Sequence, residues 1–143
     1  MDRNEFILAA LAPSGGKTMT PVQVQKLFFL LDRNLSDKLG GPFFDFQPYD
    51  YGPFDSGVYQ SLENLGLAGL VEVGTHPGRG WKTYRLSDVG RVNAEAAFNA
   101  VDKRWQEYML KLFEFVTSLS FAELVSAIYK AYPEMKANSV FRE

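Results

Sequence analysis

The chain contains no cysteine among its 143 residues, and its only histidine is His76. The absence of cysteine excludes disulfides and thiolate metal ligands, and it fits a reducing compartment. Because a zinc site would have to combine one histidine with carboxylates alone, we expect no metal and no cofactor. Catalysis by a nucleophile, a histidine and an acid would also have to use His76, which lies in a glycine-rich segment, so this chemistry is not expected.

The chain also lacks a basic excess. Its net charge is −2 and its isoelectric point is about 5.5. Proteins that bind nucleic acid gain most of their affinity from cationic contacts to phosphates. DNA binding by this chain would therefore require a local basic patch, or a dimer that concentrates one.

Long apolar runs and enzyme motifs are missing as well. No apolar run approaches the roughly 18 residues that span a bilayer, and the first residues show no signal-peptide pattern. We therefore expect a cytoplasmic protein with no membrane contact. The sequence has no phosphate-binding loop, dinucleotide fingerprint or zinc-protease motif, and nothing singles out a catalytic pair among its 17 acidic residues. We expect no enzyme.

What the chain does have is a composition suited to one buried core, with 46% apolar and 15% aromatic residues. Capping boxes and apolar stripes at helical spacing predict most of its helices. These helices are expected at 2–12, 21–38 and 55–65, from 88 to about 115 with a break near Asn99, and at 121–132.

Alternating apolar and polar residues predict two strands, at 70–73 and 81–86, joined by the glycine-rich loop 74–80. The aromatic segment 43–50 is expected to be a short edge strand or an extended segment, since Pro48 cannot donate within a sheet. Residues 51–53, Tyr-Gly-Pro, are expected to form a turn.

The order helix, strand, loop, strand, helix predicts a mostly helical α+β fold. Its specific form would be winged-helix-like, with a two-stranded wing and additional C-terminal helices. We predict one domain over 1–143, in which 1–86 form the core and wing and 87–143 form a helical extension. The phrase YRLSDVGR, which begins at Tyr84, resembles the Y-x-L-T-x-x-G junction that follows the wing in bacterial winged-helix regulators.

A second resemblance covers roughly residues 20–65. The phrases TPVQVQKLFFLL and YGPFDSGVYQSLENL are similar to the Panacea, or SocA-like, antitoxin domain, in which a Q-K-L-L-Y helix precedes a Y-G-P-V-x-x-x-V-Y stretch. Phe54 stands where that family usually has valine. The resemblance implies a binding function, either toxin neutralisation or transcriptional regulation, and it carries over no catalytic residue. The matching positions are Gln25, Lys26, Leu27, Phe28, Phe29, Tyr51, Gly52, Pro53, Val58 and Tyr59.

If double-stranded DNA is the ligand, the helix 55–65 is the expected reader and the wing the expected phosphate contact. That helix has polar outward positions but no lysine or arginine, so a solvated polar face is the competing interpretation. The wing likewise competes with an ordinary charged hairpin. The candidate DNA-binding residues are Ser56, Gln60, Ser61, Asn64, His76, Arg79, Lys82 and Arg85.

If a protein is the ligand, two aromatic groups are candidates for the interface. The first group, around the Tyr-Gly-Pro turn, is either an interaction surface or core that fixes the helix entry. The second, after the wing, is either a homodimer interface or core beneath the final helix. The candidate interface residues are Tyr51, Phe54, Tyr59, Trp105, Tyr108 and Leu112.

Two hypotheses for function remain. The first is a small non-enzymatic regulator, either a DNA-binding transcriptional regulator or an antitoxin from a toxin–antitoxin pair, that acts as a dimer. The alternative is a protein-interaction module, toxin-neutralising or an adaptor, that uses the winged helix as a scaffold without binding DNA. The absence of lysine and arginine from the helix at 55–65 favours the alternative.

Overall fold

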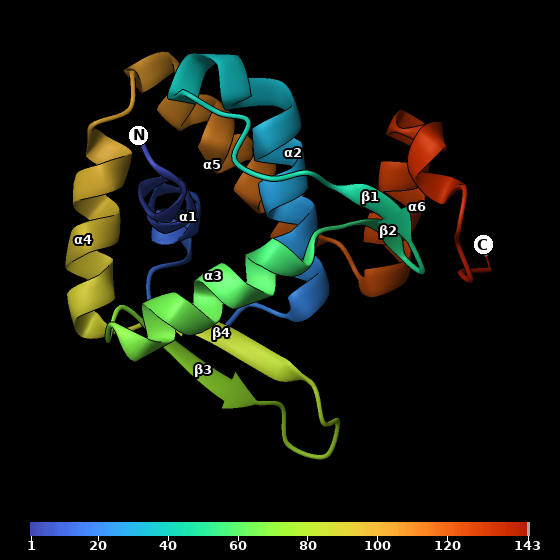
Figure 1. The fold of residues 1–143 in the computed structure, drawn as a ribbon, viewed down its shortest axis with the longest axis horizontal. Helices are drawn as coiled ribbons and strands as arrows, with labels where there is room; N and C mark the ends of the chain where they lie inside the picture. Colours follow the sequence, from blue (N-terminus) through green and yellow to red (C-terminus); the bar gives the residue numbers. More distant parts are fainter. Residues whose placement is uncertain (143) are drawn as a thin grey trace.

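A computed structural model describes residues 1–142, which form an α+β fold of helices and two small antiparallel hairpins (Figure 1). The α-helices are α1 (Arg3–Leu11), α2 (Pro21–Leu39), α3 (Ser56–Leu67), α4 (Asp88–Asn99), α5 (Lys103–Ser118) and α6 (Phe121–Ala131). The strands are β1 (Gln47–Tyr49), β2 (Gly52–Phe54), β3 (Val71–Thr75) and β4 (Lys82–Leu86). Short 3₁₀ helices cover η1 (Ala12–Ser14) and η2 (Pro133–Lys136).

The helices begin where the side-chain caps predict. Complete capping boxes link Asp2 to Glu5 at α1, Thr20 to Gln23 at α2, and Ser120 to Glu123 at α6. Helix α2 ends at Gly40, whose φ of 92° is left-handed, a conformation that glycine adopts at helix ends without strain. The expected break near Asn99 is also present, since α4 stops there and α5 starts at Lys103.

Helix α2 crosses the middle of the molecule (Figure 1). Helix α1 packs against α4, and α5 packs against α2, so the helices after residue 87 cover the first two helices. Seven consecutive residues of α2, from Gln25 to Leu31, are buried, which leaves no solvated side at this level of the helix. The core is therefore built around α2 from both halves of the chain.

The two hairpins have different surroundings. Strand β3 pairs with β4, from Val71 opposite Leu86 to Thr75 opposite Lys82, and its loop extends away from the helices (Figure 1). Strand β1 pairs with β2, with Gln47 opposite Phe54, and lies beside α6 and η2. The strand at 47–49 confirms the edge-strand prediction.

Three sequence predictions need correction. Residues 52–53 belong to strand β2 instead of a turn, since the chain reverses at Asp50 and Tyr51. The α4 residues Val89 and Val92 are exposed, although both were expected in the apolar stripe of that helix. The prediction was wrong because α4 contacts α1 through its other face, which includes the buried residues Gly90 and Ala94.

Within residues 1–142, none of the helices combines the length and the apolar character required to cross a membrane.

Candidate binding groove

Two adjacent polar side chains of α2 hold the segment that begins helix α3. The carboxamide of Gln25 donates to the backbone carbonyl of Asp55 at 3.0 Å and accepts from its backbone amide at 3.1 Å. The amino group of Lys26 donates to the carbonyl of Pro53 at 3.3 Å. Both side chains are buried, so α2 fixes the path of β2 through polar contacts inside the protein.

The same segment is fixed from its own side by Gly52 and Asp55. Gly52 has φ of 104°, and a Cβ there would lie within 3.6 Å of both the Lys26 side chain and the Tyr129 ring. Glycine adopts this left-handed backbone conformation without the strain that a side chain would add. The Asp55 carboxylate accepts from the amides of Gly57 and Asp45, which caps α3 and ties it to the extended segment before β1.

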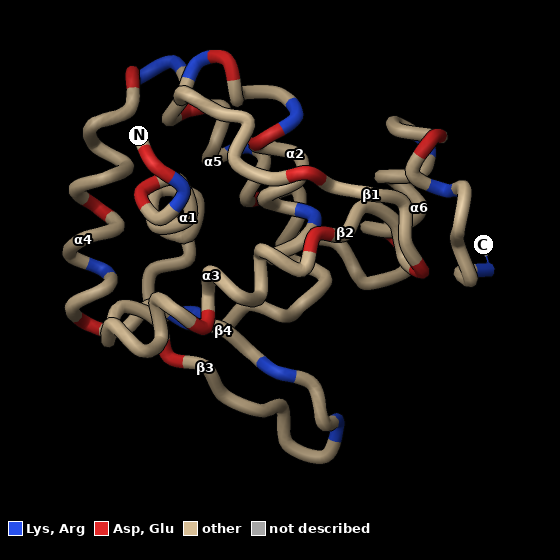
Figure 2. Tube along the Cα trace, viewed as in Figure 1, with Lys and Arg blue, Asp and Glu red and all other residues tan. Residues whose placement is uncertain are grey.

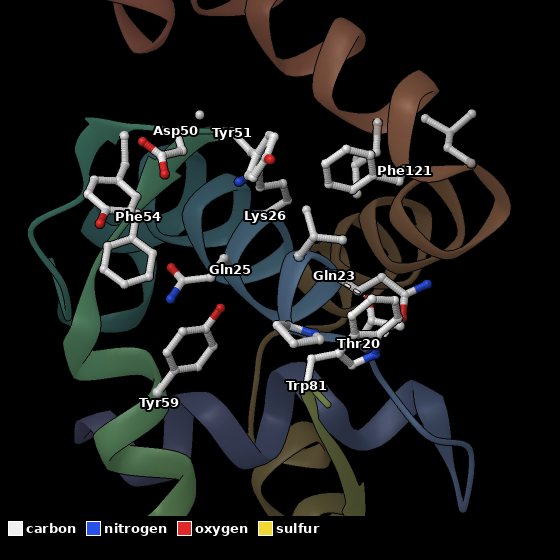
Figure 3. Close-up of a pocket in the computed structure, with 16 residues that line it drawn as sticks. Thr20, Gln23, Gln25, Lys26, Asp50, Tyr51, Phe54, Tyr59, Trp81 and Phe121 are labelled. Atoms are coloured by element: carbon white, nitrogen blue, oxygen red, sulfur yellow. Dashed lines mark hydrogen bonds between the residues drawn. The ribbon is translucent and has the colours of Figure 1, made fainter. Parts of the chain in front are cut away.

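Beside these contacts the surface opens into a groove of about 710 Å³ (Figure 3). Its walls come from the start of α2, the β1–β2 hairpin, Tyr59 of α3, Trp81 before β4, and the residues from Leu119 to Leu124. We call this feature the aromatic groove. Its volume falls within the range typical of ligand-binding pockets.

The aromatic side chains of the groove contact one another in pairs. The rings of Tyr49 and Phe54 stack at 4.8 Å, and Phe54 meets Tyr59 edge-on at 5.7 Å. On the opposite side, Tyr51 and Phe121 meet edge-on at 5.2 Å. These contacts hold the rings in fixed positions and join elements that are distant in sequence.

Four of the groove's large side chains remain between 41% and 53% exposed: Tyr49, Tyr51, Trp81 and Phe121. Partly exposed aromatic rings gathered around a concavity are typical of surfaces that bind protein segments. Of the two interpretations of the aromatic turn, the geometry combines both. Phe54 and Tyr59 are partly buried and Tyr51 is exposed, yet all three line the same groove.

Lys26 gives the groove its one cationic group. Burial lowers the pKa of its amino group to about 8, from an ordinary value of 10.5, because desolvation disfavours the charged form. At pH 7 the group is still mostly protonated. Among residues 1–142, no carboxylate lies within ion-pair distance of its nitrogen.

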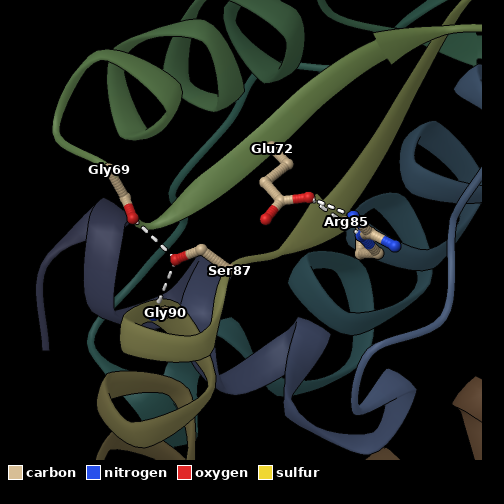
Figure 4. A network of polar contacts seen from close by, with 5 residues as sticks. All are labelled: Gly69, Glu72, Arg85, Ser87 and Gly90. Atoms are coloured by element: carbon tan, nitrogen blue, oxygen red, sulfur yellow. Dashed lines mark hydrogen bonds and ion pairs between the residues drawn. The ribbon is translucent and has the colours of Figure 1, made fainter.

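The charges of the β3–β4 hairpin are partly neutralised by carboxylates close to them. Lys82 forms an ion pair with Glu63 of α3, and Arg85 forms one with Glu72 across the strands (Figure 4). Figure 2 shows cationic positions along β4 and its loop, with acidic positions only near the end of the hairpin that meets the helices. Arg79, at the loop, is exposed and lies over the Trp81 ring at 5.5 Å.

On α3, the outward polar face is smaller than expected. Ser56, Gln60 and Asn64 are exposed, whereas Ser61 is only 7% exposed and faces the core. Ser61 therefore has to be removed from the candidate DNA-binding residues. It follows Val58 by three positions and precedes Leu65 by four, which places it on the buried side of the helix.

The second aromatic group is part of the protein's own core. Trp105, Tyr108 and Leu112 are partly buried and pack against the core cluster, with α5 lying along α2. Of the two alternatives, core beneath the final helix is replaced by packing of α5 against α2, and the homodimer interface stays a prediction. On the outer side of α5, Leu110 and Phe115 are the exposed apolar residues.

His76 lies in the loop between β3 and β4, with Nδ1 2.9 Å from the Pro77 carbonyl and its ring 5.1 Å from that of Trp81. Among the described residues no three acidic or histidine side chains gather into a potential metal site.

Sequence reasoning did not place Trp81, Phe121 or Lys26 in one groove. Trp81 and Phe121 were assigned to a strand and a helix, and only the tertiary fold brings them to the hairpin at 47–54. Lys26 did carry a signal. It lies inside the apolar block that runs from Val24 to Leu31, where a solvated lysine has no place.

The fold and the site define an α+β protein with an open aromatic groove floored by a buried lysine. Comparison with known proteins adds no family to this description, because no family model, curated protein or solved structure gave a significant match.

Proposed function

We propose that this chain is a winged-helix-like protein-interaction module that binds an extended segment of a partner protein in its aromatic groove. The observation that carries the proposal is the set of half-exposed rings around the groove, from Tyr49, Tyr51, Trp81 and Phe121. Aromatic residues at the centre of an interface supply most of its binding energy. The resemblance to an antitoxin domain agrees with this, since neutralising a toxin or presenting it to another protein requires binding alone.

The groove suits a protein segment better than a small molecule. A small-molecule pocket buries most of its ligand and most of its own lining. Here the rings at the rim are close to half exposed and come from separate elements, so a ligand that covered them all would extend along the surface. An extended peptide with alternating side chains has that shape.

Binding to DNA is the second candidate, and the hairpin that projects from the helices favours it (Figure 2). Arg79 near its tip is exposed and has the position of a side chain that enters a groove of DNA. Against this, Lys82 and Arg85 are already paired with carboxylates, and α3 from Ser56 to Leu67 contains no cation. A surface of this charge offers few phosphate contacts, so we rank DNA second.

Co-purification from the native host distinguishes the two functions. The tagged wild-type chain is compared with a groove variant, Tyr51→Ala/Phe121→Ala, and a hairpin variant, Arg79→Ala/Lys82→Ala/Arg85→Ala. We expect one stoichiometric protein partner with the wild type and the hairpin variant, and its loss with the groove variant. Equal recovery with the groove variant contradicts the proposal.

The DNA candidate is tested in parallel by selecting genomic fragments at low salt, where phosphate contacts are strongest. Enrichment of a sequence by the wild type, abolished in the hairpin variant, would establish DNA as the ligand in place of a protein.

A further inference from the structure

We propose that the aromatic groove is specific for a partner segment with an internal Asp or Glu beside an apolar anchor residue, and that Lys26 is the residue that binds this carboxylate. The inference rests on the proposed function, because it names the chemistry of the segment that the groove takes.

Lys26 is buried at a position that a ligand bound in the groove would contact. Its side chain is only 3% exposed, and it lines the groove (Figure 3). The ammonium group has three donors, of which one reaches the Pro53 carbonyl. No ion pair is formed by this group with any of residues 1–142, and buried charges are ordinarily paired.

The fold does not require a charged group at position 26. The contact to Pro53 requires a single donor, and the fold already holds the same segment through two hydrogen bonds from Gln25 to Asp55. Burial lowers the pKa of Lys26 to about 8, because desolvation disfavours the ammonium form. A carboxylate beside Lys26 would reverse this effect, because an opposite charge favours the protonated amine.

The charge of the lining selects the kind of anion. Lys26 is the one cation among the residues that line the groove, and Asp50 is the one acid. A phosphate group carries close to two negative charges and is usually held by several cationic or backbone donors. With one cation buried and one acid in the lining, a singly charged carboxylate is the better match.

The surroundings of Lys26 select the neighbour of that carboxylate. Tyr51, Phe121 and Leu124 provide an apolar wall near the α6 end, while Phe54 and Tyr59 form the other wall. An apolar or aromatic side chain next to the acid would fill the space between these walls, and its contact would exclude water from the ion pair. In such a desolvated setting, loss of one charged partner weakens binding by about 30-fold or more.

The test begins with a random-peptide library, displayed within a fusion so that no peptide has a free carboxyl terminus. The full-length wild type, Lys26→Met and the control Lys111→Met, at an exposed lysine of α5, are each used for selection. We expect the wild type and the control to enrich peptides with Asp or Glu next to an apolar residue. Lys26→Met should enrich peptides that keep the apolar residue and lose the acid.

A double-mutant cycle then isolates the pair. The best wild-type peptide is synthesised with its acid and with the acid replaced by the corresponding amide, Glu→Gln or Asp→Asn. We expect the amide peptide to bind the wild type about 30-fold or more weakly, and to bind Lys26→Met as well as the acidic peptide does. The wild-type half of the cycle needs no variant protein, so misfolding of Lys26→Met cannot hide the result.

The outcomes separate this inference from the proposed function. Peptides enriched by the wild type without an acidic preference overturn the role of Lys26 and leave the groove as a peptide site. Peptides that bind only with a free carboxyl terminus overturn the internal acid. If none of the proteins enriches a peptide that Tyr51→Ala/Phe121→Ala fails to bind, groove binding itself is wrong, and both proposals fall together.

Discussion

The side chain of Gln25 pairs with the backbone of Asp55 as a neighbouring strand would, with one hydrogen bond donated and one accepted at 3.0 and 3.1 Å. Thirty residues separate the two positions in sequence. Helix α2 thus supplies, with one carboxamide, the pair of hydrogen bonds that a neighbouring strand would give to Asp55, the residue between β2 and α3. The next residue of α2, Lys26, adds one more hydrogen bond to the same segment, donated to the Pro53 carbonyl.

Replacement of Gln25 by glutamate tests this pairing. Gln25→Glu keeps the shape and the acceptor but places an oxygen against the Asp55 carbonyl where an N–H is now donated. Because the group is buried and the carbonyl loses its donor, we expect the free energy of unfolding to fall by about 2 to 4 kcal/mol. Urea denaturation at pH 7 measures the change.

Gln23→Glu is the matched control. The same substitution two residues earlier affects the capping box of α2, where the Gln23 side chain accepts from the Thr20 amide at 3.0 Å. Glutamate keeps that acceptor and suits the positive end of the helix, so stability should change by less than about 0.5 kcal/mol. Equal losses in both variants would mean that the paired geometry at Asp55 contributes nothing specific.

A second prediction concerns the strand-to-helix junction. A Cβ built on Gly90 would lie 1.8 Å from the carbonyl oxygen of Leu70, which is backbone and cannot rotate away. Ser87 draws the two segments together, because its hydroxyl donates to the Gly69 carbonyl at 2.6 Å and accepts from the Gly90 amide at 2.9 Å (Figure 4). Gly90→Ala should therefore lower stability by about 3 kcal/mol or more.

Gly16→Ala serves as its control in thermal unfolding. The nearest atom to a Cβ there is a flexible arginine nitrogen of Arg91 at 3.8 Å, which is ordinary contact. We expect no loss of stability, or a small gain from the lower entropy of the unfolded chain. A Gly90→Ala protein that melts with the wild type would contradict the close approach of Leu70.

These two motifs also show what the sequence could and could not predict. Local signals were sufficient for the helices, since capping residues and apolar spacing act within a few positions, as at Thr20 and Gln23. The residue types at Gln25, Lys26 and Gly52 were visible as a family-like pattern, but their mutual contacts were not. The aromatic groove depends on Trp81 and Phe121 meeting the hairpin at 47–54, and no short-range pattern encodes a contact over such separations.

Exposure explains the errors of detail in the same way. Ser61 was predicted to be exposed because it is polar, and Val89 and Val92 were predicted to be buried because they are apolar. The structure has the reverse in each case. Side-chain polarity predicts burial poorly at the boundary between the buried and exposed faces of a helix, because a small rotation of the helix about its axis changes which residues are buried there. Helix α4 packs on α1 through the face that carries Gly90 and Ala94, which leaves Val89 and Val92 exposed.

The third prediction concerns the ion pairs of the β3–β4 hairpin. Lys82 with Glu63 and Arg85 with Glu72 are solvent-exposed pairs, so each contributes little to folding. Lys82→Ala should change the free energy of unfolding by less than about 1 kcal/mol, and Arg85→Ala should leave the denaturation midpoint nearly unchanged. Both changes should shrink further in 1 M salt. Denaturation at low and high salt measures both. Losses of several kcal/mol would show that the hairpin is a structural element held by these charges.

The last prediction concerns the effect of the Lys26 charge on the pH dependence of stability. In the unfolded chain a lysine titrates near 10.5, whereas burial lowers the pKa of Lys26 in the folded protein to about 8. Between these values the unfolded state binds more protons than the folded state, so stability rises as the pH increases through this window. Below pH 8 both states are protonated, and the folded protein carries the full cost of the buried charge.

Lys26→Met removes that cost along with the hydrogen bond to Pro53. The pKa difference corresponds to about 3 kcal/mol and the lost hydrogen bond to about 1 kcal/mol, so the variant should be about 2 kcal/mol more stable at pH 7. This advantage should disappear as the pH rises from 8 toward 10.5. A side chain that costs stability and is nevertheless present is expected where binding requires it.

Urea denaturation of both proteins at a series of pH values measures the difference directly. Other ionisable groups near Lys26 are Asp50 and Tyr51 from the hairpin, Tyr59 from α3, Tyr129 from α6 and Lys136, whose nitrogen lies over the Tyr129 ring. They are present in both proteins, so to first order their titration cancels in the subtraction. A wild-type protein that is the more stable at pH 7, with a difference independent of pH, would show that the Lys26 charge is accommodated without cost and would remove the energetic argument for its role in binding.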